Sequence, residues 1–148
     1  MIHTLRALFA RDLQRVHAEI TAYRTERALW QVAGTVPNAA GNLCLHIVGN
    51  LNTYIGAALG RTEYVRDRDA EFARQDVPKA ELLRQVEATV GVVDSTLATL
   101  TVADLQREFP VRVFAEPTST EFLLVHLTTH LAYHLGQINY HRRLLDAQ

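Results

Sequence analysis

The sequence predicts an all-α fold, a four-helix bundle with a long crossover between the second and third helices. Apolar residues recur at steps of three and four over four stretches, each about 20 to 27 residues long, which is the spacing of amphipathic helices. Two of the connections are short and one is long. The chain has 148 residues, of which 48% are hydrophobic. That length and composition suit one domain, residues 1–148, with one core.

The first two helices are predicted at residues 4–30 and 38–59. Charged residues separate the apolar positions of the first stretch, and a glycine and a proline in 32–38 interrupt the pattern. The second stretch contains three glycines, which weaken a helix by up to about 1 kcal/mol each. Their expected compensation is the close approach of a neighbouring helix. These glycines are Gly41, Gly49 and Gly56.

Residues 61–76 are polar, charged and aperiodic, which predicts the long crossover loop. Asp76 is expected to cap the third helix, with Pro78 in its first turn. The core-facing stripe of this helix is predicted to be Leu83, Val86, Val90, Val93, Leu97 and Leu100.

The last third of the chain begins with a break in the helical pattern at 101–117. Residues 109–114 are expected to be extended, as a short strand or ribbon. Thr118 and Glu121 have the spacing of a capping box, which predicts the start of a fourth helix that runs nearly to the C-terminus.

Charge and cysteine content exclude several classes of protein. The net charge of -1 gives no basic surface for a phosphate backbone, so we expect no nucleic-acid partner. No apolar run approaches the roughly 20 residues of a membrane span, and the N-terminus lacks the pattern of a signal peptide. The single cysteine cannot form an internal disulfide, which fits a reducing compartment. A cytoplasmic protein without a membrane partner is the expectation.

Four of the seven histidines lie within residues 121–143. His130 and His134 are four residues apart, so on a helix they lie on one face, about 6 Å apart along the axis. Both belong to the row expected to face the core, and His46 belongs to the corresponding row of the second helix. The row of the fourth helix is Leu123, Leu127, His130, His134, Gln137, His141 and Leu144. Three inward imidazoles in an apolar core need partners, and a divalent cation satisfies all three. We therefore predict a metal site formed by His46, His130 and His134.

Three residues are expected beside these ligands. His126 flanks the row of the fourth helix, Gln137 continues it, and Asn50 follows His46 by one turn. For Asn50, satisfaction by a neighbouring helix is an equally good interpretation. His141 lies about two turns beyond His134 and is expected to pack near the end of the bundle.

Three protein ligands leave at least one position of the ion open, which is typical of catalytic sites. Water, a thiol or a substrate oxygen fits there, and with water as the nucleophile the expected enzyme is a hydrolase. Zn²⁺, nickel, iron, manganese and cobalt all accept imidazole. A di-iron carboxylate site is excluded because the fourth helix has acidic residues only near its ends. Cys44 is two residues from His46 and therefore points away from the site. A non-catalytic protein with a structural or stress-sensing metal remains an alternative.

The sequence NLCLHIVGN around His46, together with HLTTHLAYHLGQI at 126–138, resembles the DinB-like (damage-inducible, YfiT-like) metal-binding four-helix bundles over essentially the whole chain. The resemblance implies the same three ligands. It also implies a thiol-dependent enzyme, a transferase or isomerase that uses bacillithiol, mycothiol or glutathione with a small-molecule substrate. Homodimers are common in this family. The usual R-G-Q tripeptide of the family is Leu135-Gly136-Gln137 here.

The charged segment 66–72 has two interpretations. Alternating signs are typical of a solvated network of ion pairs without a function. The other interpretation is a lid, or an arginine that faces the substrate.

Overall fold

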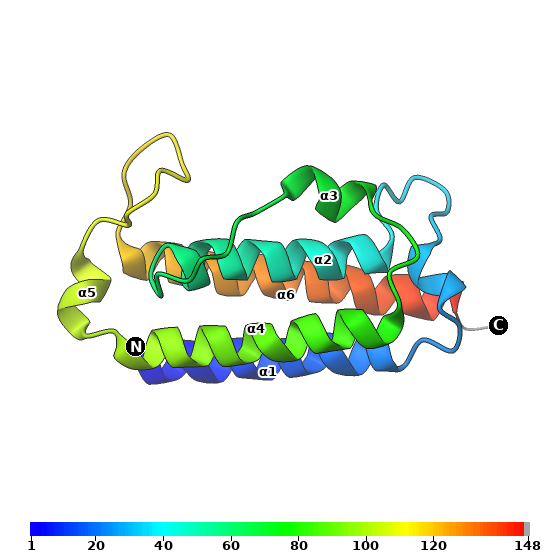
Figure 1. Cartoon of the computed structure of the whole chain (residues 1–148), viewed down its shortest axis with the longest axis horizontal. Coiled ribbons are helices and arrows are strands. Elements are labelled where there is room, and N and C mark those ends of the chain that lie inside the picture. Colours follow the sequence, from blue (N-terminus) through cyan, green and yellow to red (C-terminus); the bar gives the residue numbers. More distant parts are fainter. Residues whose placement is uncertain (147–148) are drawn as a thin grey trace.

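Four long helices lie side by side along the long axis of the molecule in the computed structural model, which describes residues 1–146 (Figure 1). They are α1 (Ile2–Thr21), α2 (Ala40–Leu51), α4 (Lys79–Thr99) and α6 (Thr120–Leu145). Helix α1 contacts α4 and α6, and α2 contacts the same two helices, so the four enclose one core. The predicted all-α four-helix bundle is confirmed.

The direction of the helices explains the long crossover. Helices α1 and α6 run one way along the bundle, and α2 and α4 run the other way (Figure 1). Because α2 and α4 are parallel, the chain must return along the whole bundle between them. This return segment contains a short helix, α3 (Arg68–Ala73), which packs on α2. The prediction of an irregular loop over 61–76 is therefore wrong at α3, where the Asp67 side chain accepts a hydrogen bond from the Ala70 amide at 3.0 Å.

The first helix is shorter than the predicted range 4–30. It ends at Thr21, and a 3₁₀ turn, η1 (Arg27–Trp30), follows. The backbone amides of Arg24 and Thr25 donate to the carboxylate of Asp146, at 2.6 and 3.4 Å. This carboxylate at the end of α6 gives the two amides partners outside a helix, so the chain turns there.

The second predicted helix consists of α2 and a π-helical segment, η2 (Asn52–Ala57). All twelve residues of α2 are buried, because α3 and η1 cover this helix in addition to α4 and α6. The expected close approaches occur, but at Gly41 the neighbour is the Trp30 ring of η1, and at Gly49 it is a carboxylate of α3. The π segment was not predicted, because its extra residue per turn has no signal in the hydrophobic pattern.

The core face of α4 differs from the predicted stripe. Val86, Val93 and Leu97 are buried as expected, whereas Leu83, Val90 and Leu100 lie at the edge of the core. Two threonines take part in the core. The hydroxyl of Thr89 is satisfied within its own helix, where it donates to the Gln85 carbonyl at 2.7 Å. The inward residues are Leu82, Val86, Thr89, Val93, Thr96 and Leu97.

Both predicted helix starts were displaced. Pro78 is the N-cap of α4, and Asp76 has a positive φ of 56° and does not cap it. Helix α6 begins after Ser119, whose hydroxyl accepts from the Phe122 amide at 3.1 Å, instead of after Thr118. The Thr118 carbonyl accepts from the Phe109 amide at 2.8 Å, which holds Thr118 outside the helix.

The segment before α6 contains one more short helix, α5 (Val102–Gln106), with a capping box formed by Thr101 and Asp104. The predicted extended ribbon at 109–114 does not form: these residues have no strand, and one isolated antiparallel bridge, between Glu108 and Ser119, lies just outside them. Among the described residues, no helix combines the length and the apolar character that a membrane crossing requires.

Candidate metal centre

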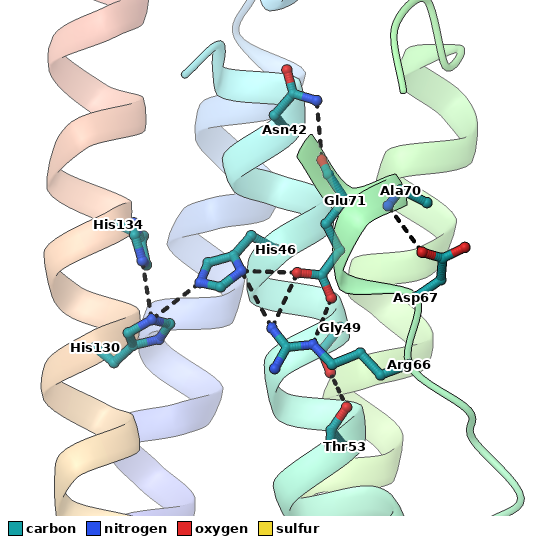
Figure 2. A network of polar contacts seen from close by, with 10 residues as sticks. All are labelled: Asn42, His46, Gly49, Thr53, Arg66, Asp67, Ala70, Glu71, His130 and His134. Atoms are coloured by element: carbon teal, nitrogen blue, oxygen red, sulfur yellow. Dashed lines mark hydrogen bonds and ion pairs between the residues drawn. The ribbon is translucent and has the colours of Figure 1, made fainter. Parts of the chain in front are cut away.

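His46, His130 and His134 meet between α2 and α6 (Figure 2). The Nε2 atom of His130 lies 3.2 Å from Nε2 of His46 and 3.1 Å from Nε2 of His134. Two ligands at about 2.1 Å from one ion, at angles of about 90 to 109°, are about 3.0 to 3.4 Å apart. His130 therefore lies at the distance that one shared divalent ion requires from each of the other two predicted ligands, and all three ligand atoms lie within 4.8 Å of one another.

The outer nitrogens of two of these rings fix the tautomers. Nδ1 of His46 faces Oε2 of Glu71 at 2.9 Å, and Nδ1 of His134 faces Oε1 of Gln137 at 2.7 Å. Both oxygens accept hydrogen bonds, so both Nδ1 atoms carry the hydrogen and both Nε2 atoms carry a lone pair. These two lone pairs point at Nε2 of His130, which has at most one hydrogen to donate. A cation satisfies all three nitrogens at once, so the donor set fits a metal ion.

Burial keeps the three imidazoles neutral. Desolvation is the largest cause that lowers the pKa of His46, His130 and His134. For His130 the nearby histidines and Arg66 add to burial and lower the pKa to about 3. A neutral ring is the form that binds a metal ion, so proton competition at these nitrogens is weak at pH 7.

Glu71 is the residue of this site that the sequence analysis missed. It is 6% exposed and comes from α3. Its carboxylate contacts His46 and accepts from Arg66 through Nε at 2.7 Å and Nη2 at 3.1 Å (Figure 2). In the sequence, Glu71 is one of three acidic residues of the charged segment 66–72, and nothing distinguishes it from Asp67 and Asp69. That segment is not wholly solvated, since the Arg66 side chain is only 14% exposed.

The three residues expected beside the ligands differ in their contacts. Gln137 hydrogen-bonds His134, as described above. His126 has no side-chain hydrogen bond to a ligand among residues 1–146; its ring centroid lies 6.3 Å from that of His130 and 5.0 Å from that of Phe114. Asn50 is buried, and its Oδ1 has no hydrogen-bond partner in the described part of the chain.

His141 and Cys44 lie outside the cluster. His141 is buried near the end of α6, where Nδ1 accepts from the Tyr23 hydroxyl at 2.7 Å and Nε2 donates to the Gln31 carbonyl at 2.8 Å. Both its nitrogens are satisfied without a metal. Cys44 is fully buried, and burial raises the pKa of its thiol to about 12. This thiol is therefore neither ionised nor accessible as a nucleophile.

An apolar pocket of about 360 Å³ lies at the end of the bundle where His141 is buried, between the loop 33–38 and the last turns of α6. Gln137 and Leu43 form part of its wall. Gln137 is one turn beyond His134, and Leu43 is one turn before His46. The pocket therefore begins one helical turn from the cluster on each helix, and the three clustered histidines are not part of its wall.

These features define a class: a helical bundle in which two antiparallel helices direct three neutral imidazoles at one point, as in metal-binding bundles. The chain belongs to the DinB superfamily, because the model of that family matches residues 8–138. A search of curated proteins gave no significant match.

The fold is similar to that of a conserved protein from Enterococcus faecalis, known by its crystal structure. The TM-score is 0.80 and the sequence identity is 18%, and the match covers 100% of this chain and 98% of that one. At this identity the likeness shows the fold alone.

Proposed function

We propose that the protein is a metal-dependent enzyme in which a divalent ion, Zn²⁺ or Ni²⁺ in the first place, activates a low-molecular-weight thiol or water for attack on a small electrophile. The convergence of the three Nε2 atoms carries this proposal. A bound divalent ion lowers the pKa of a water or thiol in its remaining position. Iron, manganese and cobalt suit the same imidazole set.

The chain's own residues hold this site in place. Glu71 and Gln137 orient His46 and His134 through their Nδ1 atoms. His46 is buried, whereas His130 and His134 are half-buried, so the cluster is reached from the side of α6. The nucleophile is an external molecule, since the only thiol of the chain is enclosed in the core. A reducing cytoplasm, where low-molecular-weight thiols are abundant, suits this use.

The apolar pocket beside Gln137 is the proposed place for the carbon skeleton of the electrophile. Its volume of about 360 Å³ lies in the range of small-molecule sites. Its wall consists mainly of aliphatic and aromatic side chains from the loop 33–38 and α6. A substrate with an apolar part and one reactive polar group fits this surrounding.

Metal titration of the metal-free protein tests the site. The native protein should bind one equivalent of Zn²⁺ or Ni²⁺, and His46→Ala, His130→Ala and His134→Ala should each weaken binding by orders of magnitude. His3→Ala, at an exposed position of α1, is the matched control. Stoichiometric binding that survives all three ligand substitutions would show that the assignment is wrong. A screen of thiols and electrophiles with the loaded protein then tests the activity.

The alternative is a metal that only stabilises the bundle or senses stress. The deep burial of His46 and Glu71 favours it, because a site built into the core contributes directly to folding. Inactivity with every thiol, together with a melting temperature that collapses on chelation, would support this alternative over the enzyme.

A homodimer is part of the proposal. Helix α6 exposes a row of large apolar side chains, each 41 to 68% exposed: Phe122, Val125, Tyr133, Tyr140 and Leu144. Two copies of α6 packed antiparallel bring the acidic start of one helix, at Glu121, to the basic end of the other, at Arg143. Sedimentation equilibrium should therefore give a dimer that Tyr133→Glu dissociates. A monomeric native protein would rule the dimer out.

A further inference from the structure

We infer that Glu71 is a positioning residue for the metal site. Gly49 leaves the space that its carboxylate occupies beside His46, and Asn42 holds the backbone of α3 in place. The inference rests on the proposed metal site. It assigns a role to the short helix α3, whose docking on α2 then becomes linked to metal affinity.

The carboxylate of Glu71 acts on His46 through a direct contact. Its Oε2 accepts from Nδ1 of His46 at 2.9 Å, which leaves Nε2 of the same ring free for a metal ion. Arg66 holds both oxygens of the carboxylate, at 2.7 and 3.1 Å, and so limits its rotation (Figure 2). A carboxylate on the outer nitrogen of a ligating histidine fixes the ring and raises its basicity.

Gly49 explains how a side chain of α3 reaches this depth. It lies in the middle of the buried helix α2, three residues after His46. A Cβ at this position would overlap Oε1 and the carboxyl carbon of Glu71. The carboxylate therefore occupies the space that a side chain of α2 would fill, and glycine is required here by the contact.

The backbone of α3 is fastened to the same helix. The Asn42 side-chain amide donates to the carbonyls of Glu71 and Arg74, at 3.0 and 2.8 Å. The ring of Phe72 packs against that of His46, with centroids 5.0 Å apart. A helix of six residues is not stable alone, so α3 depends on these contacts with α2. Because one contact serves both, metal binding and the docking of α3 stabilise each other.

Competition of the protein with a chelator for Zn²⁺ tests the inference. Glu71→Met removes the acceptor at similar length, and Gly49→Ala displaces the carboxylate; each should weaken binding about 10- to 100-fold. Glu71→Gln, which keeps an oxygen acceptor, should recover part of the loss. Gly91→Ala is the matched control, because nothing lies within 4 Å of a Cβ at that exposed glycine of α4.

Two further measurements separate positioning from a general structural effect. In nitrogen-15 spectra of the metal-free protein, His46 should be in the Nδ1–H form in the native chain and in both tautomers in Glu71→Met. The double variant Arg66→Met/Glu71→Met should show the same loss of affinity, which excludes the unpaired Arg66 charge as its cause. Gly49→Ala and Glu71→Met combined should lose no more than the larger single loss, because both act through one contact.

The outcomes are distinct. Native Zn²⁺ affinity and an unchanged His46 tautomer in Glu71→Met would overturn the inference about Glu71. If His46→Ala loses Zn²⁺ binding in the same experiment, the proposed metal site still stands. Native affinity in His46→Ala would overturn the metal site itself. If Gly49→Ala does not fold, Glu71→Met still decides, since it adds no atom to α2.

Discussion

Asn42 is the residue whose removal should release α3 with the least disturbance elsewhere. It lies in the first turn of α2 and is 7% exposed. Its side-chain amide donates hydrogen bonds to the carbonyls of Glu71 and Arg74. Asn42→Ala removes these two bonds. The substitution leaves the histidines, Glu71 and its ion pair unchanged, so its effect on the site passes through the backbone of α3.

The size of the effect follows from the two bonds. A hydrogen bond contributes about 0.5 to 1.5 kcal/mol net, so the loss of both costs about 1 to 3 kcal/mol. Since about 1.4 kcal/mol corresponds to a factor of ten, the fraction of molecules with α3 undocked should rise about 5- to 150-fold.

Hydrogen exchange measures this opening. The amide of Arg74, which donates to the Ala70 carbonyl at 3.0 Å, should exchange faster by the same factor. Ser95→Ala is the control, because it removes an exposed hydroxyl that bonds only within α4. Exchange at the native rate in Asn42→Ala would refute the view that these two bonds hold α3.

Four stability measurements complete the predictions. Zn²⁺ at about one hundred times its dissociation constant should add about 2.7 kcal/mol and raise the melting temperature by about 5 to 11 °C, and a chelator should reverse the shift. Burial lowers the pKa of His141, so its imidazole binds a proton less readily in the folded state than in the unfolded chain. The neutral imidazole therefore contributes its full stability above the unfolded pKa of about 6.5, and this contribution is lost as the pH falls. In urea titrations of metal-free protein from pH 7 to 5, His141→Gln should therefore reduce the slope by up to about 1.4 kcal/mol per pH unit, and an unchanged slope would contradict this. Phe9→Ala should cost about 3 to 5 kcal/mol in the same assay, because the ring is fully buried. Gly91→Ala should stabilise the protein by about 0.5 to 1 kcal/mol, since no atom lies within 4 Å of a Cβ at this position of α4. A loss of stability would contradict this, because it would require a clash at the new methyl group.

Local periodicity was enough to predict the bundle and to bring its three histidines together. The step of four between His130 and His134 fixes their common face on any α-helix. His46 could be assigned because the apolar positions of α2 before the π segment follow the regular helical repeat. These are properties of single helices, which the sequence determines without knowledge of the connections.

The predicted inward row of α6 fails at its far end for a geometric reason. It starts at Leu123, which is buried, and ends at Leu144, which is 68% exposed. A row with a repeat of 3.5 residues drifts about 20° per heptad on a straight helix with 3.6 residues per turn. Over the three heptads from Leu123 to Leu144, the drift reaches about 60°, which moves Leu144 out of the core.

Glu71 could not be predicted for a different reason. Its role depends on α3 lying on α2, and this contact joins a charged segment to a glycine more than twenty residues earlier in the chain. Neither the charge pattern nor Gly49 alone indicates the other. The contact follows from the parallel direction of α2 and α4, which forces the return segment along α2 (Figure 1).

The two helices that bear the histidines are far apart in the sequence: His46 and His130 are separated by 84 residues. An ion that joins them closes a ring from more than half of the chain. For disulfides, closing a ring of this size removes about 4 to 5 kcal/mol of chain entropy from the unfolded state. An ion that stays bound during unfolding would leave a tethered ring, in which α2 and α6 remain neighbours. The metal-loaded chain should then refold faster than the metal-free chain, because the ion already holds His46 close to His130 in the unfolded state.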